Sequence, residues 1–125
     1  MIITEHIHII LLLSGAFTLL PILVFLLPTR GPRLLFGIDA PDGAGGLFTR
    51  HWSVLAPSLG ALLIYAAWHP ELRAPLMLAA GIEKGGLIGL IMADWNKPHT
   101  AGMRPIVIVD LAIVAAYAMY LFHLL

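Results

Sequence analysis

Residues 74–93 read APLMLAAGIEKGGLIGLIMA, an apolar run with a glutamate and a lysine, Glu83 and Lys84, side by side at its centre. An α-helix rises about 1.5 Å per residue, so a run of this length covers the roughly 30 Å hydrocarbon core of a bilayer. The run therefore predicts a transmembrane helix. Ionisable groups at its centre are costly in lipid, so we expect other helices to enclose Glu83 and Lys84.

The composition of the whole chain agrees with a membrane protein. Of its 125 residues, 60% are hydrophobic and 11% are charged, whereas soluble domains average about 25% charged residues. We expect one integral membrane domain over residues 1–125. Its start lacks the basic region and cleavage site of a secretory signal, so we expect the first helix to be retained. There is no cysteine, which excludes disulfides and thiol catalysis.

Apolar runs of membrane-spanning length recur along the chain and predict an all-α, polytopic protein folded as an antiparallel bundle of four transmembrane helices. The predicted spans are about 7–27, 51–68, 74–93 and 105–122.

Prolines and glycines mark the expected breaks. Pro21 lacks a backbone donor and is predicted to kink the first span near Phe17. Residues 28–49 are expected to form the longest loop, with the glycine-rich PDGAGG at 41–46 as a flexible part of it, and HPELR at 69–73 is expected to be a tight turn.

The basic residues predict the orientation. Four spans place both termini on one side of the membrane and the first and third loops on the other. Arg73 is the only lysine or arginine on the side of the termini. Lysines and arginines concentrate in cytoplasmic loops, so we predict a multi-pass protein of the cell membrane with both termini on the non-cytoplasmic side. The basic residues of the first and third loops are Arg30, Arg33, Arg50, Lys97 and Arg104.

The ionisable residues near the predicted cytoplasmic end are expected to form one cluster within the membrane. Lys84 can extend toward the level of Asp110, and residues at the start of the second span are expected to reach Glu83 or Asp110. Such a cluster is either a substrate, proton or ion site or a structural network of salt bridges. Without a cation nearby, Glu83 would be held neutral, as a proton carrier requires. The predicted members are Arg50, His51, Glu83, Lys84 and Asp110.

Small residues predict close helix packing at two places. Ala56 and Gly60 give the second span a small-xxx-small face. Gly81, Gly85 and Gly89 form a glycine stripe on the third span, roughly opposite Glu83. The stripe predicts either a deeply enclosed third helix or, in preference, a homo-oligomer. The alternative is that the glycines have no specific role, because glycine is common in membrane helices.

Histidines and acids gather at the predicted outer end, where they could bind a metal ion or haem. No metal-binding spacing supports such a site, so we expect neither a metal nor a cofactor. These residues are Glu5, His6, His8, His69, Glu71 and His123.

The layout resembles the small DoxX-like four-helix membrane proteins. It has a longer first loop, Arg50-His51-Trp52 opening the second span, a charged centre in the third and Asp110 early in the fourth. The resemblance implies a compact antiparallel four-helix bundle. Its members are often of unknown role and are sometimes tied to quinone or redox enzymes.

Three functions follow from these residues. The first is a non-enzymatic membrane subunit or scaffold that oligomerises, and it is preferred because no catalytic motif is present. The second is a small proton-coupled transporter or channel protomer with Glu83 as the coupling acid. The third is a membrane-embedded enzyme or redox partner that acts on a lipid or quinone, with Asp110, Glu83 and His51 as acid and base.

The expected partners are membrane lipid and further subunits. A balance of seven basic and seven acidic side chains without a basic run argues against binding to nucleic acid.

Overall fold

The computed structural model describes residues 2–124, and 84% of the chain is helical with no strand among the described residues. The predicted all-α fold is confirmed. In chain order the elements are α1 (Ile2–Glu5), α2 (Ile7–Leu19), α3 (Ile22–Leu26), α4 (Arg30–Phe36), α5 (Gly43–Ala66), α6 (Pro70–Ala93), the 3₁₀ helix η1 (Pro98–Met103) and α7 (Arg104–Leu124).

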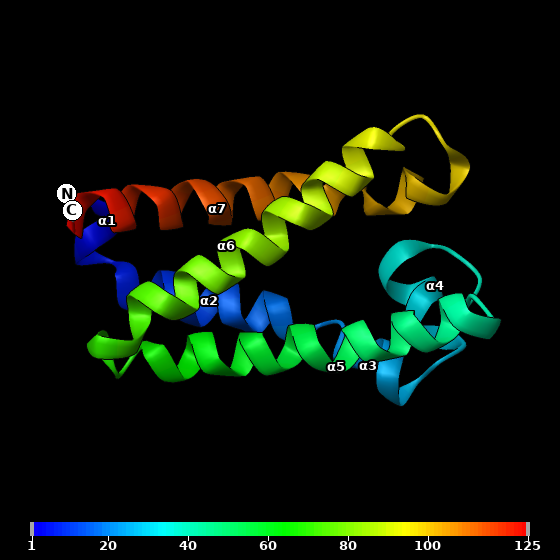
Figure 1. Ribbon diagram of the computed structural model, residues 1–125, viewed down its shortest axis with the longest axis horizontal. Coiled ribbons are helices and arrows are strands. Elements are labelled where there is room, and N and C mark those ends of the chain that lie inside the picture. Colours follow the sequence, from blue (N-terminus) through cyan, green and yellow to red (C-terminus); the bar gives the residue numbers. More distant parts are fainter. Residues whose placement is uncertain (1, 125) are drawn as a thin grey trace.

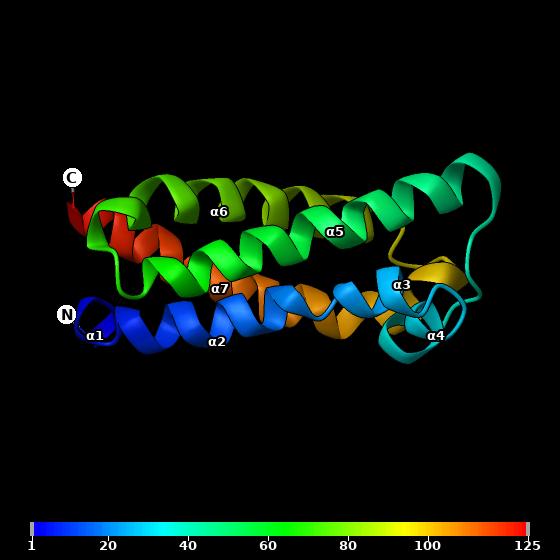
Figure 2. The same ribbon diagram turned by 90° about the horizontal axis from the view of Figure 1, so that it is seen from below.

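The long helices lie side by side, and consecutive ones run in opposite directions (Figures 1 and 2). Helix α2 packs along α5, α6 packs along α7, and α5 also contacts α3 and α6. The two chain ends lie at one end of the molecule, whereas α4 and η1 lie at the other (Figure 1). Helices α5 and α6 meet at the short connection near the chain ends and diverge toward α4 (Figure 1).

Three helices are long and apolar enough to cross a membrane: Ile7–Leu26, Pro70–Ala93 and Pro98–His123. They correspond to three of the four predicted spans. Helix α5, the predicted second span, is not among them, because Arg50 and His51 lower the hydropathy of its first half.

Large apolar side chains point away from the protein on all of the long helices. Leu13 is 68% exposed, Ile82 68% and Ile108 70%, and Leu55 and Leu62 of α5 are also exposed. Soluble monomers rarely expose contiguous apolar surface on this scale. The exterior therefore fits a hydrocarbon environment better than water.

The first predicted span is broken at its proline, as expected. Helix α2 ends at Leu19 and α3 begins at Ile22, because Pro21 has no N–H to donate and its ring crowds the preceding turn. Leu20 N–H instead donates to the carbonyl of Phe17. The break lies at residues 20–21, one turn after the predicted position.

Two predicted loop segments are helical, so those predictions are wrong. Residues 30–36 form α4, which ends at Gly37 with a left-handed φ of 66° that favours glycine. Residues 43–46 are the first turn of α5 and not a flexible loop. Gly46 lies directly against the carbonyl of Pro41, where a Cβ would clash, so glycine serves close packing here.

The remaining helix ends are close to the predictions. Helix α6 begins at Pro70, so the predicted HPELR turn is wrong for residues 70–73, which form the first turn of α6. The helix ends at Ala93 as predicted. Proline at a first helical position is favourable because its missing N–H would have no partner there. Helix α7 starts one residue before Pro105.

Helices α2 and α5 approach each other closely at two glycines. A Cβ built on Gly15 would lie 2.7 Å from the carbonyl oxygen of Gly60, and a Cβ on Gly60 would lie equally close to the carbonyl oxygen of Gly15. Gly60 and the neighbouring Ala56 are both buried. The predicted packing face of the second span is therefore confirmed, and α2 is its partner.

The core is divided along the long axis. A large apolar cluster, including Leu11, Leu63, Met77 and Tyr117, fills the end that holds the termini. A small cluster of Ile88, Ile91 and Val107 lies between α6 and α7 near the other end. On α6 and α7, the ionisable residues Glu83, Lys84 and Asp110 lie between these two clusters in sequence.

Candidate functional site

A cavity of about 250 Å³ lies in the half of the molecule that contains α4. Helices α2, α4, α5, α6 and α7 all contribute to its wall, together with η1 and the break at Pro21. The wall is mostly apolar, and its ionisable side chains are Glu83, Lys84 and Asp110. The fold thus forms a partly open cavity next to three of the five predicted cluster residues.

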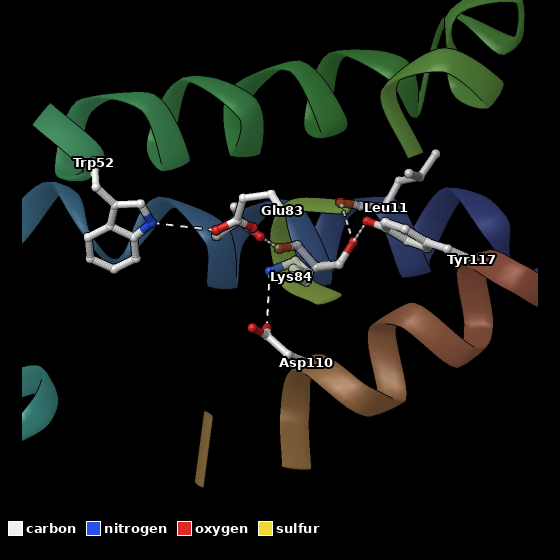
Figure 3. A network of polar contacts seen from close by, with 8 residues as sticks. Leu11, Trp52, Glu83, Lys84, Asp110 and Tyr117 are labelled. Carbon is white, nitrogen blue, oxygen red and sulfur yellow. Dashed lines mark hydrogen bonds and ion pairs between the residues drawn. The ribbon is translucent and has the colours of Figure 1, made fainter. Parts of the chain in front are cut away.

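Lys84 and Asp110 form a buried ion pair across this cavity (Figure 3). The Lys84 Nζ donates to Asp110 Oδ1 at 3.1 Å, and the two side chains are only 3% and 2% exposed. The Lys84 Nζ also lies 5.5 Å from the centre of the Phe17 ring, within cation–π range. Lys84 and Asp110 therefore neutralise each other inside the protein.

Glu83 has a different environment from its neighbour. Its carboxylate accepts one long hydrogen bond from Trp52 Nε1, with Nε1 and Oε1 3.5 Å apart (Figure 3). No Lys, Arg or His among residues 2–124 forms an ion pair with it. A carboxylate offers about four acceptor positions, so most of its hydrogen-bonding capacity is free on the cavity side.

Arg50 and His51 lie outside the cavity, so the predicted contact with Glu83 or Asp110 is wrong for both. Arg50 donates to the carbonyl of Phe25 at 3.4 Å and its guanidinium lies 5.2 Å from the Phe25 ring. His51 is exposed. Successive residues of a helix are about 100° apart, and α5 turns Trp52 inward, so the two preceding residues point elsewhere.

Buried hydroxyl groups lie on α2 and α7 between the cavity and the main core. The Thr18 Oγ1 donates to the Ser14 carbonyl at 2.6 Å, and the Ser14 hydroxyl bonds the Tyr117 hydroxyl (Figure 3). All three side chains are buried. Tyr117 is therefore a core residue that ties α7 to α2 and has no contact with the ion pair in Figure 3.

Two aromatic residues of the cavity were not among the predicted site residues. Trp52 lies near the start of the predicted second span, and its indole faces Glu83. The spacing Trp52, Ala56, Gly60 could have revealed this, because residues four apart share a helix face and Ala56 and Gly60 already marked the packing side. Phe36 comes from α4, and its ring centre is 6.0 Å from that of Trp52; only the tertiary fold brings it there.

The glycine stripe lies on an open surface. A Cβ on Gly81, Gly85 or Gly89 would meet nothing within 4 Å. Of the two predicted explanations, a deeply enclosed third helix is therefore wrong for this face, since no described part of the chain covers it.

Three of the four outer histidines bond to backbone carbonyls. The Nδ1 atoms of His6, His8 and His69 each lie 2.9 Å from a carbonyl oxygen. Within residues 2–124, no three His, Asp or Glu side chains are grouped so that they could hold a metal ion.

Comparisons with protein-family models, curated proteins and solved structures give no match for this chain. The assignment of a role depends on the geometry described above.

Proposed function

We propose that the chain is a small multi-pass protein of the cell membrane in which α5 crosses the bilayer together with the three more apolar spans, giving an antiparallel four-helix bundle. Helix α5 has 24 residues, and about 20 suffice to cross the hydrocarbon core. It packs along α2, and its Ser53 and Ser58 hydroxyls donate to carbonyls of their own helix. Its polar groups are thus compatible with a membrane.

The charge distribution supports the predicted orientation. Arg30, Arg33 and Lys97 lie with the other basic loop residues at the end that holds α4 and η1 (Figure 1). At the opposite end, Arg73 donates to the carbonyls of Ala66 and Ala67. We propose that the α4 end is cytoplasmic and that both termini are outside.

Within this membrane protein, we propose that the cavity is the binding site of a proton-coupled carrier, with Glu83 as the coupling acid. One observation supports this most directly: Glu83 is the only acid of the cavity without an ion-pair partner, whereas Asp110 is paired with Lys84. A charged carboxylate without a cation is costly at low dielectric. Glu83 therefore binds a proton when the cavity is empty and releases it when a cationic substrate enters.

The geometry changes the order of the three functions considered from the sequence. A purely structural charge network would pair every charge, and Glu83 is the exception. An acid–base enzyme with His51 has little support, because His51 lies outside the cavity.

The carrier is tested in liposomes that hold the purified protein and a pH-sensitive dye. With inorganic and organic monovalent cations present to exchange for protons, we expect an imposed pH gradient to drive proton movement that Glu83→Gln abolishes. Glu71→Gln is the matched control, because Glu71 is an exposed glutamate on the same helix. Infrared spectra should show a protonated carboxyl signal that Glu83→Gln removes and Glu71→Gln keeps. Equal proton movement with Glu83→Gln would overturn the proposal.

A second role is supported by the open glycine stripe, namely assembly as a homo-oligomer or as a subunit of a membrane complex. Membrane helices associate through small residues because their backbones can approach closely. The stripe faces away from the cavity, so assembly and binding can coexist. Gly85→Leu should reduce the cross-linked oligomer in lipid, and Gly86→Leu, one position off the stripe, should not. An unchanged oligomer in Gly85→Leu, or none in the wild type, would rule out assembly through this face.

A further inference from the structure

When Glu83 is ionised, the wall of the cavity carries one uncompensated negative charge. Glu83, Lys84 and Asp110 are its ionisable groups, and Lys84 and Asp110 are joined at 3.1 Å. The Lys84 ammonium has its partner, so no free positive group faces the space. The Thr18 hydroxyl donates elsewhere, to the Ser14 carbonyl. The Lys84 ammonium keeps N–H groups beyond its bond to Asp110, but an anion would compete with Asp110 for them and would be repelled once Glu83 is ionised.

A metal ion fits this wall poorly. Hard cations such as Ca²⁺ require about six to eight oxygen ligands, and a single free carboxylate supplies two. The other lining side chains near Glu83 are carbon-rich, including Leu87, Pro105 and Ile106. A cation that binds here must therefore bring its own apolar surface.

Three aromatic rings line the cavity, and one of them, Trp52, bonds the free carboxylate. Phe17, Phe36 and Trp52 line the cavity, and the Phe36 and Trp52 rings are 6.0 Å apart with a tilt of 43°. Aromatic faces attract ammonium groups, most strongly where water is excluded. The position of the Lys84 ammonium 5.5 Å from Phe17 is an internal instance of this contact.

The volume limits the size of the ligand. Sites for drug-sized molecules usually measure about 300–1,000 Å³, and this cavity has about 250 Å³. A lipid or a long-tailed quinone is too large to be enclosed. The space suits a compact molecule with few atoms outside its charged centre.

We propose that the cavity binds a small monovalent organic cation, an alkylated or aryl-substituted ammonium, with its charge against Glu83 and its apolar groups against Trp52 and Phe36. This inference rests on the proposed carrier function and names its substrate class. Binding replaces the proton on Glu83 by the ammonium ion: the carboxyl O–H bond breaks, the proton leaves to solvent and the carboxylate pairs with the cation. The net charge of the cavity is zero before and after the exchange.

The probe for the test is benzyltrimethylammonium, and benzenesulfonate is an anionic control of similar size. Isothermal titration of the full-length protein in lipid nanodiscs should show saturable binding of the cation and none of the anion. In weakly buffered solution, cation binding should release protons. We expect Glu83→Gln to weaken binding about thirtyfold or more, as for loss of one member of a buried charge pair, and Glu71→Gln to leave it unchanged.

A second pair of variants tests the aromatic contact without altering any charge. Trp52→Leu should weaken binding of the cation about three- to thirtyfold through loss of the cation–π contact, together with the hydrogen bond to Glu83. Trp68 is an exposed tryptophan just beyond the other end of α5, and Trp68→Leu should leave binding unchanged. Both variants should retain wild-type helicity by circular dichroism.

The outcomes separate this inference from the proposed function. Proton movement that depends on Glu83, without cation binding, would overturn the substrate class and leave the proton carrier standing. Cation binding of equal strength in Glu83→Gln, or equal binding of benzenesulfonate, would overturn the inference as well. Absence of Glu83-dependent proton movement would overturn the carrier itself.

Discussion

Lys84 on α6 and Asp110 on α7 form an ion pair at 3.1 Å in which neither side chain exposes more than 3% of its surface. Both ions lose their hydration, so the arrangement is stable only while both partners are present. The pair joins neighbouring helices through residues that are 26 positions apart. It therefore fixes how α6 and α7 face each other.

Removal of one partner should destabilise the fold strongly. We expect Lys84→Met to lower the free energy of unfolding by about 3–5 kcal/mol, because Asp110 is left buried and uncompensated. The double variant Lys84→Met/Asp110→Leu should recover most of this loss. Denaturant unfolding in detergent micelles, followed by circular dichroism, measures both.

The control for this prediction is an exposed pair. Arg33 and Asp39 lie 2.6 Å apart, with side chains that are 67% and 85% exposed. Asp39→Asn should change the unfolding free energy by less than about 1 kcal/mol. Equal losses for Asp39→Asn and Lys84→Met would show that the buried pair is not essential to packing.

The glycine contact between α2 and α5 should also be sensitive to substitution. A Cβ on Gly60 would lie 2.7 Å from the Gly15 carbonyl oxygen, so Gly60→Ala must push the helices apart and should cost about 1–3 kcal/mol. Gly86→Ala meets nothing within 4 Å and should be neutral or stabilise by up to about 1 kcal/mol. The same unfolding experiment compares them. A neutral Gly60→Ala would mean that the helices are not in contact there.

The sequence predicted the helical class because long apolar runs leave few alternatives in a membrane. It also placed Lys84 near Asp110, since a charge within such a run requires a partner and the length of the lysine side chain limits the choice. The Ala56 and Gly60 spacing indicated the packing face of α5. Each of these predictions needs only the spacing of residues along a helix and their depth in the membrane, and both can be read from the sequence.

The wrong predictions have a common physical cause: at those positions the structure depends on tertiary contacts. The loop prediction for 41–46 followed from glycine content, but contact with Pro41 makes those glycines part of α5. Arg50 and His51 were placed by depth in the membrane, whereas helix rotation decides which side chains face inward. Phe36 reaches the cavity only because α4 lies at the end of the molecule where α5 and α6 diverge. No spacing in the sequence indicates this position of α4.

The proposed four crossings can be tested by cysteine labelling, because the chain contains no cysteine of its own. Single cysteines at the exposed positions Glu5, Asp39, Glu71 and Asn96 are treated with a membrane-impermeant maleimide on intact cells. We expect Glu5→Cys and Glu71→Cys to react from outside, and Asp39→Cys and Asn96→Cys to react only after the membrane is permeabilised. Labelling of Glu71→Cys together with Asp39→Cys would show that α5 does not cross.

Asp94, at the end of α6 and outside the apolar spans, should titrate at unusually low pH. The hydrogen bond from Lys97, followed by the weaker effect of the one from His99, lowers the pKa of Asp94 below its ordinary value of 3.8. The Lys97 Nζ lies 3.2 Å from Asp94 Oδ1, and the His99 Nε2 lies 3.1 Å from Asp94 Oδ2. Because the folded-state pKa is the lower one, these bonds stabilise the turn above pH 3.8, and the contribution is lost as the pH falls through the folded-state value. Carboxyl carbon NMR of labelled aspartate should show this low midpoint, Asp94→Asn should remove the signal, and Lys97→Met should move the midpoint up toward 3.8. A wild-type midpoint at or above 3.8 would contradict the prediction.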